Sequence, residues 1–163
     1  MTLSTITIDI NDQAYSAEVE PRRLLSDFIR EDAGLTGTHV GCEHGVCGAC
    51  TVQLDGAPVR SCLMLAIQAE GRSVRTVEGL SDSPEFHPLQ KAFLDAHGLQ
   101  CGYCTPGLLM SLEPYIRDAD EISEQGIREA IAGNICRCTG YQSIVDAVQI
   151  AAEEMRPQED AER

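Results

Sequence analysis

Apolar and polar residues alternate at the start of the chain, where Ile6, Ile8 and Ile10 recur at every second position with polar residues between them. A polar segment at residues 11–13 and a second short run over residues 14–19 follow. Period-two alternation on both sides of a polar turn is typical of a β-hairpin with one buried face. The sequence therefore predicts that the fold begins with two antiparallel strands.

The spacing changes after this hairpin. Pro21 is a favoured residue in a first helical turn, and the apolar residues that follow it recur at helical intervals up to Gly34. A glycine-rich stretch over residues 37–50 is incompatible with a regular element. Residues 51–54, a turn at Asp55-Gly56 and residues 58–60 predict a second hairpin, and residues 73–77 predict a last strand. Strands with one helix indicate an α+β arrangement for this half.

Helical periodicity dominates after Gly79. Four helices are predicted, and their apolar stripes are expected to form a core. The expected starts and stops are Gly98 as the end of the first, Thr105 and Pro106 as the start of the second, Ser123 and Gly133 as the limits of the third, and Ser143 as the cap of the last. Pro114 is expected to kink or end the second helix, because proline removes a backbone donor and collides with the preceding turn.

Residues 81–84 have the composition of a linker, so the chain divides into residues 1–80 and residues 81–163, the second part ending in an acidic tail. The 163-residue chain has no Trp and 4% aromatic residues, so its core must be aliphatic. Two halves of this size are marginal without a metal or another added constraint. Bound metal would supply that constraint.

The formal net charge of −14 argues against nucleic acid as a partner, because its phosphates would repel the chain. The acidic residues among the first twenty do not fit a signal peptide, and the longest apolar stretch, Cys62 to Ile67, is too short to cross a bilayer. We expect a cytoplasmic protein without membrane insertion. Cysteines in that compartment bind metal more often than they form disulfides.

All eight cysteines fall into two groups of four, listed here as Cys42, Cys47, Cys50 and Cys62, then Cys101, Cys104, Cys136 and Cys138. The first group has the C-x4-C-x2-C spacing, with a fourth cysteine further on, of plant-type [2Fe–2S] ferredoxins. Interleaved glycines allow such a loop to turn its N–H groups toward a cluster. In the second group, the position of Cys104 at a helix start favours a thiolate. The spacing predicts two [2Fe–2S] clusters.

Three other uses of these cysteines compete with this interpretation, and each is disfavoured. Disulfides are disfavoured by the expected compartment, and two Cys₄ zinc sites are disfavoured by the x4 spacing of the first group. Thiol–disulfide exchange would use one C-x-x-C pair after a strand, whereas this chain has two such pairs, each joined by two further cysteines.

Three long motifs carry a family resemblance: residues 41–52, GCEHGVCGACTV; residues 100–107, QCGYCTPG; and residues 134–141, NICRCTGY. In this order they resemble the signatures of the molybdenum hydroxylases, and the chain resembles their small iron–sulfur subunit over roughly residues 3–155. The resemblance implies an N-terminal β-grasp ferredoxin domain over residues 1–80, followed by a four-helix-bundle [2Fe–2S] domain over residues 81–163.

The resemblance also implies the partners and the function. A large subunit would carry molybdopterin cytosine dinucleotide and a medium subunit FAD, as a dimer of heterotrimers. Electrons would pass from the molybdenum site through the two clusters to the flavin. Gln100 and Cys138 are the positions carried over as pterin contacts, and the chain itself would supply no catalytic residue.

The motif Glu43-His44-Gly45 is more similar to enzymes that act on N-heterocycles or aldehydes than to carbon monoxide dehydrogenase. We therefore expect an N-heterocycle or aldehyde substrate, with carbon monoxide as the remaining option. A stand-alone two-cluster ferredoxin that shuttles between partners is the alternative function. The helical half argues against it, because a shuttle needs only the first half.

Overall fold

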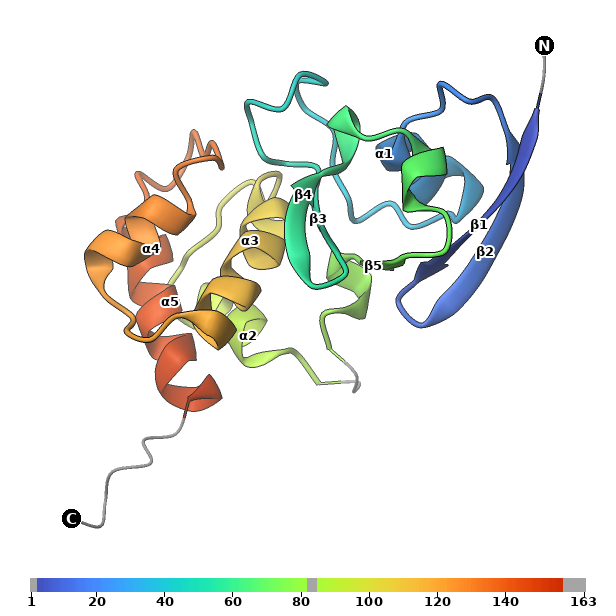
Figure 1. Ribbon diagram of the computed structural model, residues 1–163. Helices are drawn as coiled ribbons and strands as arrows, with labels where there is room; N and C mark the ends of the chain where they lie inside the picture. Colours follow the sequence, from blue (N-terminus) through green and yellow to red (C-terminus); the bar gives the residue numbers. More distant parts are fainter. Residues whose placement is uncertain (1–2, 82–84, 157–163) are drawn as a thin grey trace.

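The structure is a computed structural model that describes residues 3–81 and 85–156 (Figure 1). Residues 82–84 of the predicted linker and residues 157–163 of the predicted acidic tail therefore lie outside the described residues. Within those residues no helix has the length and apolar character that crossing a membrane requires.

One five-stranded sheet occupies the N-terminal part of the chain (Figure 1). Its strands are β1 (Ser4–Ile10), β2 (Gln13–Val19), β3 (Thr51–Leu54), β4 (Ala57–Arg60) and β5 (Ser73–Arg75), in the order β2-β1-β5-β3-β4. Strand β1 pairs parallel with β5, and the other pairs are antiparallel. Both predicted hairpins are confirmed, and Ile6, Ile8 and Ile10 are buried on one face. The last strand is shorter than predicted and ends at Arg75.

The helix predicted from Pro21 begins later. Helix α1 covers Leu25–Asp27 and continues as a π-helical turn over Phe28–Asp32. Leu24 is extended and forms a β-bridge with Leu65, and the Leu25 N–H donates to the Met64 carbonyl at 2.8 Å. A tertiary strand contact therefore holds the segment before Leu25 out of the helix. Short 3₁₀ turns lie at Ser61–Leu63, Ala66–Ala69 and Val77–Gly79.

Four helices follow the sheet: α2 (Pro88–Asp95), α3 (Thr105–Asp118), α4 (Glu124–Ala130) and α5 (Gln142–Met155). Ser123 caps α4 as predicted, since its hydroxyl accepts from the Gly126 N–H at 3.2 Å. Several predicted boundaries are wrong. Helix α2 ends at Asp95 and not at Gly98, and α4 ends at Ala130 and not at Gly133. Helix α5 begins at Gln142, after Tyr141 in the left-handed region (φ 72°), so Ser143 is not its cap.

The prediction for α3 also needs correction. Cys104, and not Thr105, is its N-cap, and the helix continues past Pro114 to Asp118. Pro114 therefore does not end the helix. The structural reason is a contact with the sheet, in which the Gln53 side chain of β3 donates to the Met110 carbonyl.

Two apolar cores are present in the described residues. One lies under the sheet and includes Ile8, Phe28 and Val52; the other lies among the helices and includes Phe93, Leu108 and Ile144. Helix α3 lies beside β3 and β4 and joins the two parts of the molecule (Figure 1). At its first turn, Gly107 has no room for a side chain, because a methyl group there would collide with the Gly48 carbonyl and lie 3.1 Å from the Ala49 Cα.

We predict that Gly107→Ala destabilises the protein. The added methyl group must push α3 away from the loop at Gly48, and overpacking of this kind costs about 1–3 kcal/mol, more than the roughly 1 kcal/mol that alanine gains over glycine inside a helix. Denaturant unfolding of the full chain measures the change. Gly98→Ala is the matched control, since its nearest neighbours are Phe93 ring atoms at 3.3 Å. Equal stability of the two variants would contradict the prediction.

Candidate metal centres

The first cysteine group (Cys42, Cys47, Cys50, Cys62) is assembled by a loop and a hairpin. Cys42, Cys47 and Cys50 lie in the loop that precedes β3, and Cys62 lies in the 3₁₀ turn that follows β4. Pairing of β3 with β4 brings the two ends together, because the Ser61 N–H and hydroxyl both donate to the Cys50 carbonyl, at 3.3 and 2.7 Å. Cys50 and Cys62 are buried.

Backbone N–H groups in this loop turn toward sulfur. Gly45 and Gly48 have φ of 80° and 75°, a conformation that glycine adopts without strain. The N–H groups of His44 and Cys47 bond the Cys42 sulfur, the latter at 3.4 Å, and these bonds lower the pKa of Cys42 to about 6. Donors arranged in this way stabilise a thiolate.

Burial has the opposite effect on Cys62. It raises the pKa of this thiol to about 11, and a hydrogen bond with Cys50 acts in the same direction. Cys42 and Cys62 therefore differ in protonation before any metal binds, and metal binding at neutral pH must release the Cys62 proton.

The second cysteine group (Cys101, Cys104, Cys136, Cys138) comes from two loops between helices. Cys101 and Cys104 lie between α2 and α3, and Cys136 and Cys138 lie between α4 and α5. The Sγ atoms of Cys101 and Cys138 are 3.6 Å apart and exposed, whereas Cys104 bonds the buried Cys136 thiol. Four helix ends thus bring together thiols that are distant in sequence.

The expectation of a thiolate at Cys104 is wrong for the metal-free thiol. Its position at the N-cap of α3 is outweighed by burial and by the bond with Cys136, which raise its pKa to about 12. The pKa of Cys136 is lowered instead: burial raises it, but the Thr139 hydroxyl, 3.2 Å from the sulfur, and backbone N–H groups outweigh burial. The helix terminus is therefore the weaker influence here.

The thiols of both groups meet two by two: Cys42 with Cys47, Cys50 with Cys62, Cys101 with Cys138, and Cys104 with Cys136. Each iron of a [2Fe–2S] rhomb takes two protein ligands, so four such pairs fit two clusters. In the described part of the chain no three His, Cys, Asp or Glu residues converge on a single ion position.

A buried hydroxyl supports the fit of the second group. Thr105 Oγ1 is buried beside Cys104 without a hydrogen-bond partner among the described residues. Buried donors in native proteins are nearly always satisfied, and the sulfur atoms of a cluster are acceptors. All eight cysteines are free thiols, so disulfides are not part of this arrangement.

The remaining predicted site residue, Gln100, is exposed and precedes Cys101. Cys101 and Cys138 are exposed as well. Contact of Gln100 or Cys138 with a pterin stays a prediction.

Residues that connect the two cysteine groups were not predicted. The Ile135 N–H donates to the Cys47 carbonyl at 2.9 Å, so the residue before Cys136 touches a residue of the first group. Tyr103 reaches in the other direction: its hydroxyl donates to the Val40 carbonyl at 2.8 Å, and its ring stacks on His39 with centroids 4.7 Å apart. No spacing rule could find these contacts, because their partners are far apart in the sequence.

A polar contact reinforces this connection. The Asn134 amide donates to the Gly48 carbonyl at 3.2 Å, and Arg60 donates to the Gly133 carbonyl at 2.7 Å. The loops carrying residues 41–50 and 132–140 both lie on the upper side of Figure 1. The two candidate centres are therefore neighbours in one structure.

Comparison with known proteins identifies both halves. Residues 8–76 match the family described as "2Fe-2S iron-sulfur cluster binding domain", and residues 76–149 match the one described as "[2Fe-2S] binding domain". The chain is 57% identical to caffeine dehydrogenase subunit gamma of Pseudomonas sp. (strain CBB1) over 91% of each protein. It is 55% identical to 6-hydroxypseudooxynicotine dehydrogenase complex subunit beta of Paenarthrobacter nicotinovorans, over 90% of this chain and 92% of that protein.

The fold is shared with a solved enzyme. A chain of quinoline 2-oxidoreductase from Pseudomonas putida 86 superposes with a TM-score of 0.90 and 49% identity, over 94% of this chain and 96% of that chain. Together with the sheet and the helices, this agreement confirms an α+β protein with a ferredoxin-like domain followed by a helical domain.

We predict that Thr139→Val lowers the reduction potential of the second-group cluster by about 20–60 mV. The variant removes a hydrogen bond to the Cys136 sulfur, and such bonds stabilise the more negative reduced state by about 0.5–1.5 kcal/mol. Potentiometric titration followed by EPR measures the shift. Thr7→Val, which removes a bond to Ser16 on β2, is the control and should leave both potentials unchanged. A potential that stays at the wild-type value in Thr139→Val would contradict the assigned role.

Proposed function

We propose a function from one premise: this chain belongs to the small iron–sulfur subunits of the molybdenum hydroxylases, the electron-transfer components of oxidoreductase complexes. Each cysteine group holds one [2Fe–2S] cluster, with its four cysteines as ligands. When bound, each cluster supplies a carrier for one electron at a time. Electrons enter from a molybdopterin cytosine dinucleotide site in a large subunit and leave to FAD in a medium subunit.

The bond between the Ile135 N–H and the Cys47 carbonyl carries this proposal. Ile135 is covalently joined to Cys136, a ligand of the second group, and Cys47 is a ligand of the first. The two sites are therefore joined by covalent bonds and one hydrogen bond of 2.9 Å, without a solvent gap. Electron tunnelling is faster through such a bonded route than through space, so these residues provide a path between the sites.

The residues exposed at each cysteine group suggest the direction in which electrons pass through the chain. Gln100, Cys101 and Cys138 are exposed at the second group, which makes this the proposed side for the pterin. Val46 and Leu63 are exposed apolar residues next to ligands of the first group, which makes this the proposed side for the flavin subunit. Apolar side chains on the surface are suited to burial in a subunit interface.

The finer features of the fold belong to the same proposal. They are a β-grasp arrangement for residues 1–80, a four-helix bundle for residues 81–163, and assembly of the complex as a dimer of heterotrimers. The names of the relatives, which include a "subunit gamma" and a "complex subunit beta", favour a subunit of a complex over a stand-alone shuttle.

For the substrate of the complex we propose an N-heterocycle. Caffeine and quinoline, after which two of the relatives are named, are N-heterocyclic compounds, and both relatives are about half identical or more to this chain. Relatives named for aldehydes are 38–42% identical. Purified complex should hydroxylate an N-heterocycle with a higher kcat/KM than any aldehyde.

We predict four irons and four acid-labile sulfides per chain, since all eight cysteines are assigned and each cluster contains two of each. Iron, zinc and labile sulfide are measured on the full chain as purified. Stoichiometric zinc without labile sulfide would rule out both clusters.

The order of the path gives a second prediction. In assembled complex, Cys138→Ser should impair reduction of both clusters by substrate. Cys47→Ser should leave the second-group cluster reducible by substrate and block reduction of the flavin. Stopped-flow absorbance and EPR distinguish these results, with molybdenum and flavin contents measured alongside because loss of a ligand can prevent assembly. The opposite pattern in the two variants would reverse the proposed direction.

A further inference from the structure

A proline inside α3 leaves one backbone carbonyl without its helical partner. Pro114 has no N–H, so the Met110 carbonyl, one turn earlier, cannot accept the usual helical hydrogen bond. The segment is buried, and an unsatisfied buried carbonyl is costly. Yet α3 continues through this position to Asp118. Another donor must compensate.

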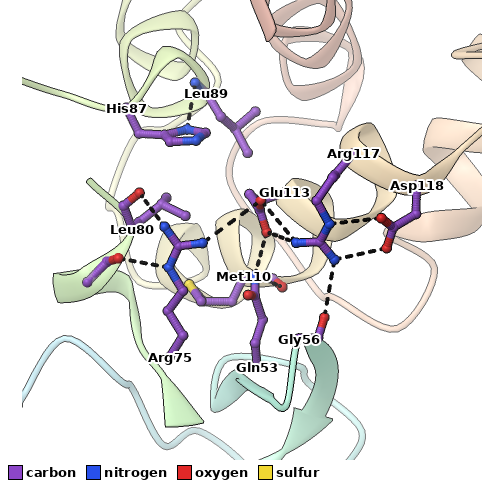
Figure 2. A network of polar contacts seen from close by, with 11 residues as sticks. Gln53, Gly56, Arg75, Leu80, His87, Leu89, Met110, Glu113, Arg117 and Asp118 are labelled. Atoms are coloured by element: carbon purple, nitrogen blue, oxygen red, sulfur yellow. Dashed lines mark hydrogen bonds and ion pairs between the residues drawn. The ribbon is translucent and has the colours of Figure 1, made fainter. Parts of the chain in front are cut away.

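Gln53 is that donor, and it comes from the sheet. This residue of β3 is 2% exposed, and its Nε2 atom lies 3.4 Å from the Met110 carbonyl. The same amide group donates to Glu113 Oε2 at 2.9 Å (Figure 2). One side chain of the first half thus satisfies both the carbonyl released by Pro114 and the carboxylate that precedes it. We call Gln53, Met110, Glu113 and Pro114 the β3–α3 junction.

Glu113 extends this junction to two arginines. Glu113 is 6% exposed, and its carboxylate lies 3.2 Å from Arg117 and 4.0 Å from Arg75. Arg75, at the end of β5, also donates to the carbonyls of Gly79 and Leu80, where the chain leaves the sheet. Figure 2 shows Glu113 between the two guanidinium groups, with Gln53 on the sheet side. A buried carboxylate is tolerated only with such partners.

The junction lies on the two elements that begin at cluster ligands. Strand β3 begins at Thr51, directly after Cys50, and α3 begins at Thr105, directly after Cys104. A rotation or slide of α3 on β3 would therefore move Cys104 relative to Cys50. The close contact of Gly107 with Gly48 fixes one end of α3, and Gln53 contacts the helix at Met110 and Glu113, about 5 and 9 Å further along at the helical rise per residue. Two separated contacts are sufficient to fix the direction of a helix.

We propose that Gln53 and Glu113 are positioning residues that hold α3 in one register on β3 and thereby set the separation and relative orientation of the two clusters. This inference rests on the proposed function only in assuming that both clusters are bound. Gln53 can pair with the carbonyl released by Pro114 in only one rotation of α3 about its axis, because other rotations turn that carbonyl away from the sheet. Apolar packing in the two cores does not select one rotation of α3 in this way.

A double-mutant cycle tests the pairing of Gln53 with the released carbonyl. Gln53→Leu should lower the apparent melting temperature of the cluster-loaded full chain by about 4–8 °C at fixed scan rate. In the background of Pro114→Ala, the new N–H at position 114 can bond Met110, so the same Gln53→Leu change should cost at least about 2 °C less. Gln125→Leu, which removes a bond to Glu129 on the exposed face of α4, is the control and should be neutral. Additive effects of Gln53→Leu and Pro114→Ala would overturn the pairing.

Magnetic interaction between the clusters tests the positioning. In the fully reduced full chain, both clusters are paramagnetic, and their dipolar splitting in the EPR spectrum depends on separation and orientation. Gln53→Leu and Glu113→Leu should change this splitting, and the near-isosteric Glu113→Gln should change it less. Glu124→Gln, in the exposed ion pair with Arg128 on α4, should leave it unchanged.

The outcomes separate the two proposals. If both clusters are present at wild-type levels and the splitting of Gln53→Leu, Glu113→Leu and Glu113→Gln equals that of wild type, the positioning role is overturned while the electron-transfer function stands. If the wild-type chain binds no clusters, the proposed function itself fails. Should Glu113→Leu not fold, the comparison of Gln53→Leu and Glu113→Gln with Glu124→Gln decides.

Discussion

The close approach of α3 to the loop of the first cysteine group is the constraint on which the rest of the structure depends. A side chain at Gly107 would collide with the Gly48 carbonyl, and a side chain at Gly48 would collide with the Gly133 carbonyl and Asn134 in the loop after α4. Gly48 also has a φ of 75°, which favours glycine for a second reason. This contact brings the loop after α4 close enough for the Ile135 N–H to bond the Cys47 carbonyl, and so joins the two candidate centres.

The surface between the halves is specified by polar groups. Ser111 bonds Asn134 at 3.1 Å, Asn134 bonds the Gly48 carbonyl, and Gln53 bonds Glu113, all in buried positions. Apolar packing has little directional preference, whereas buried polar groups are costly unless each meets its partner. The cores can therefore stabilise each half while the hydrogen bonds fix how the halves are oriented. For an electron-transfer protein, orientation decides the route between the sites.

Much of the fold could be predicted from local patterns. The alternation at Ile6, Ile8 and Ile10 gave the first hairpin, the Asp55-Gly56 turn gave the second, and Ser123 gave the start of α4. Two of the errors share one cause. A β-bridge to Leu65 keeps Leu24 out of α1, and α3 continues past Pro114 because Gln53 supplies a hydrogen-bond donor to the Met110 carbonyl. Local rules assume that a segment must satisfy its own backbone, and here distant residues do so.

The sequence by itself determined which residues bind metal in our proposal and which family the chain belongs to, because cysteine spacing and glycine positions are written along the chain. Only the tertiary structure decided how the thiols meet two by two, that Cys104 is held as a thiol while Cys136 is the more acidic partner, and how the two groups are joined. The physical reason is that burial and hydrogen-bond partners depend on neighbours in space. Those neighbours come from segments that no local pattern connects.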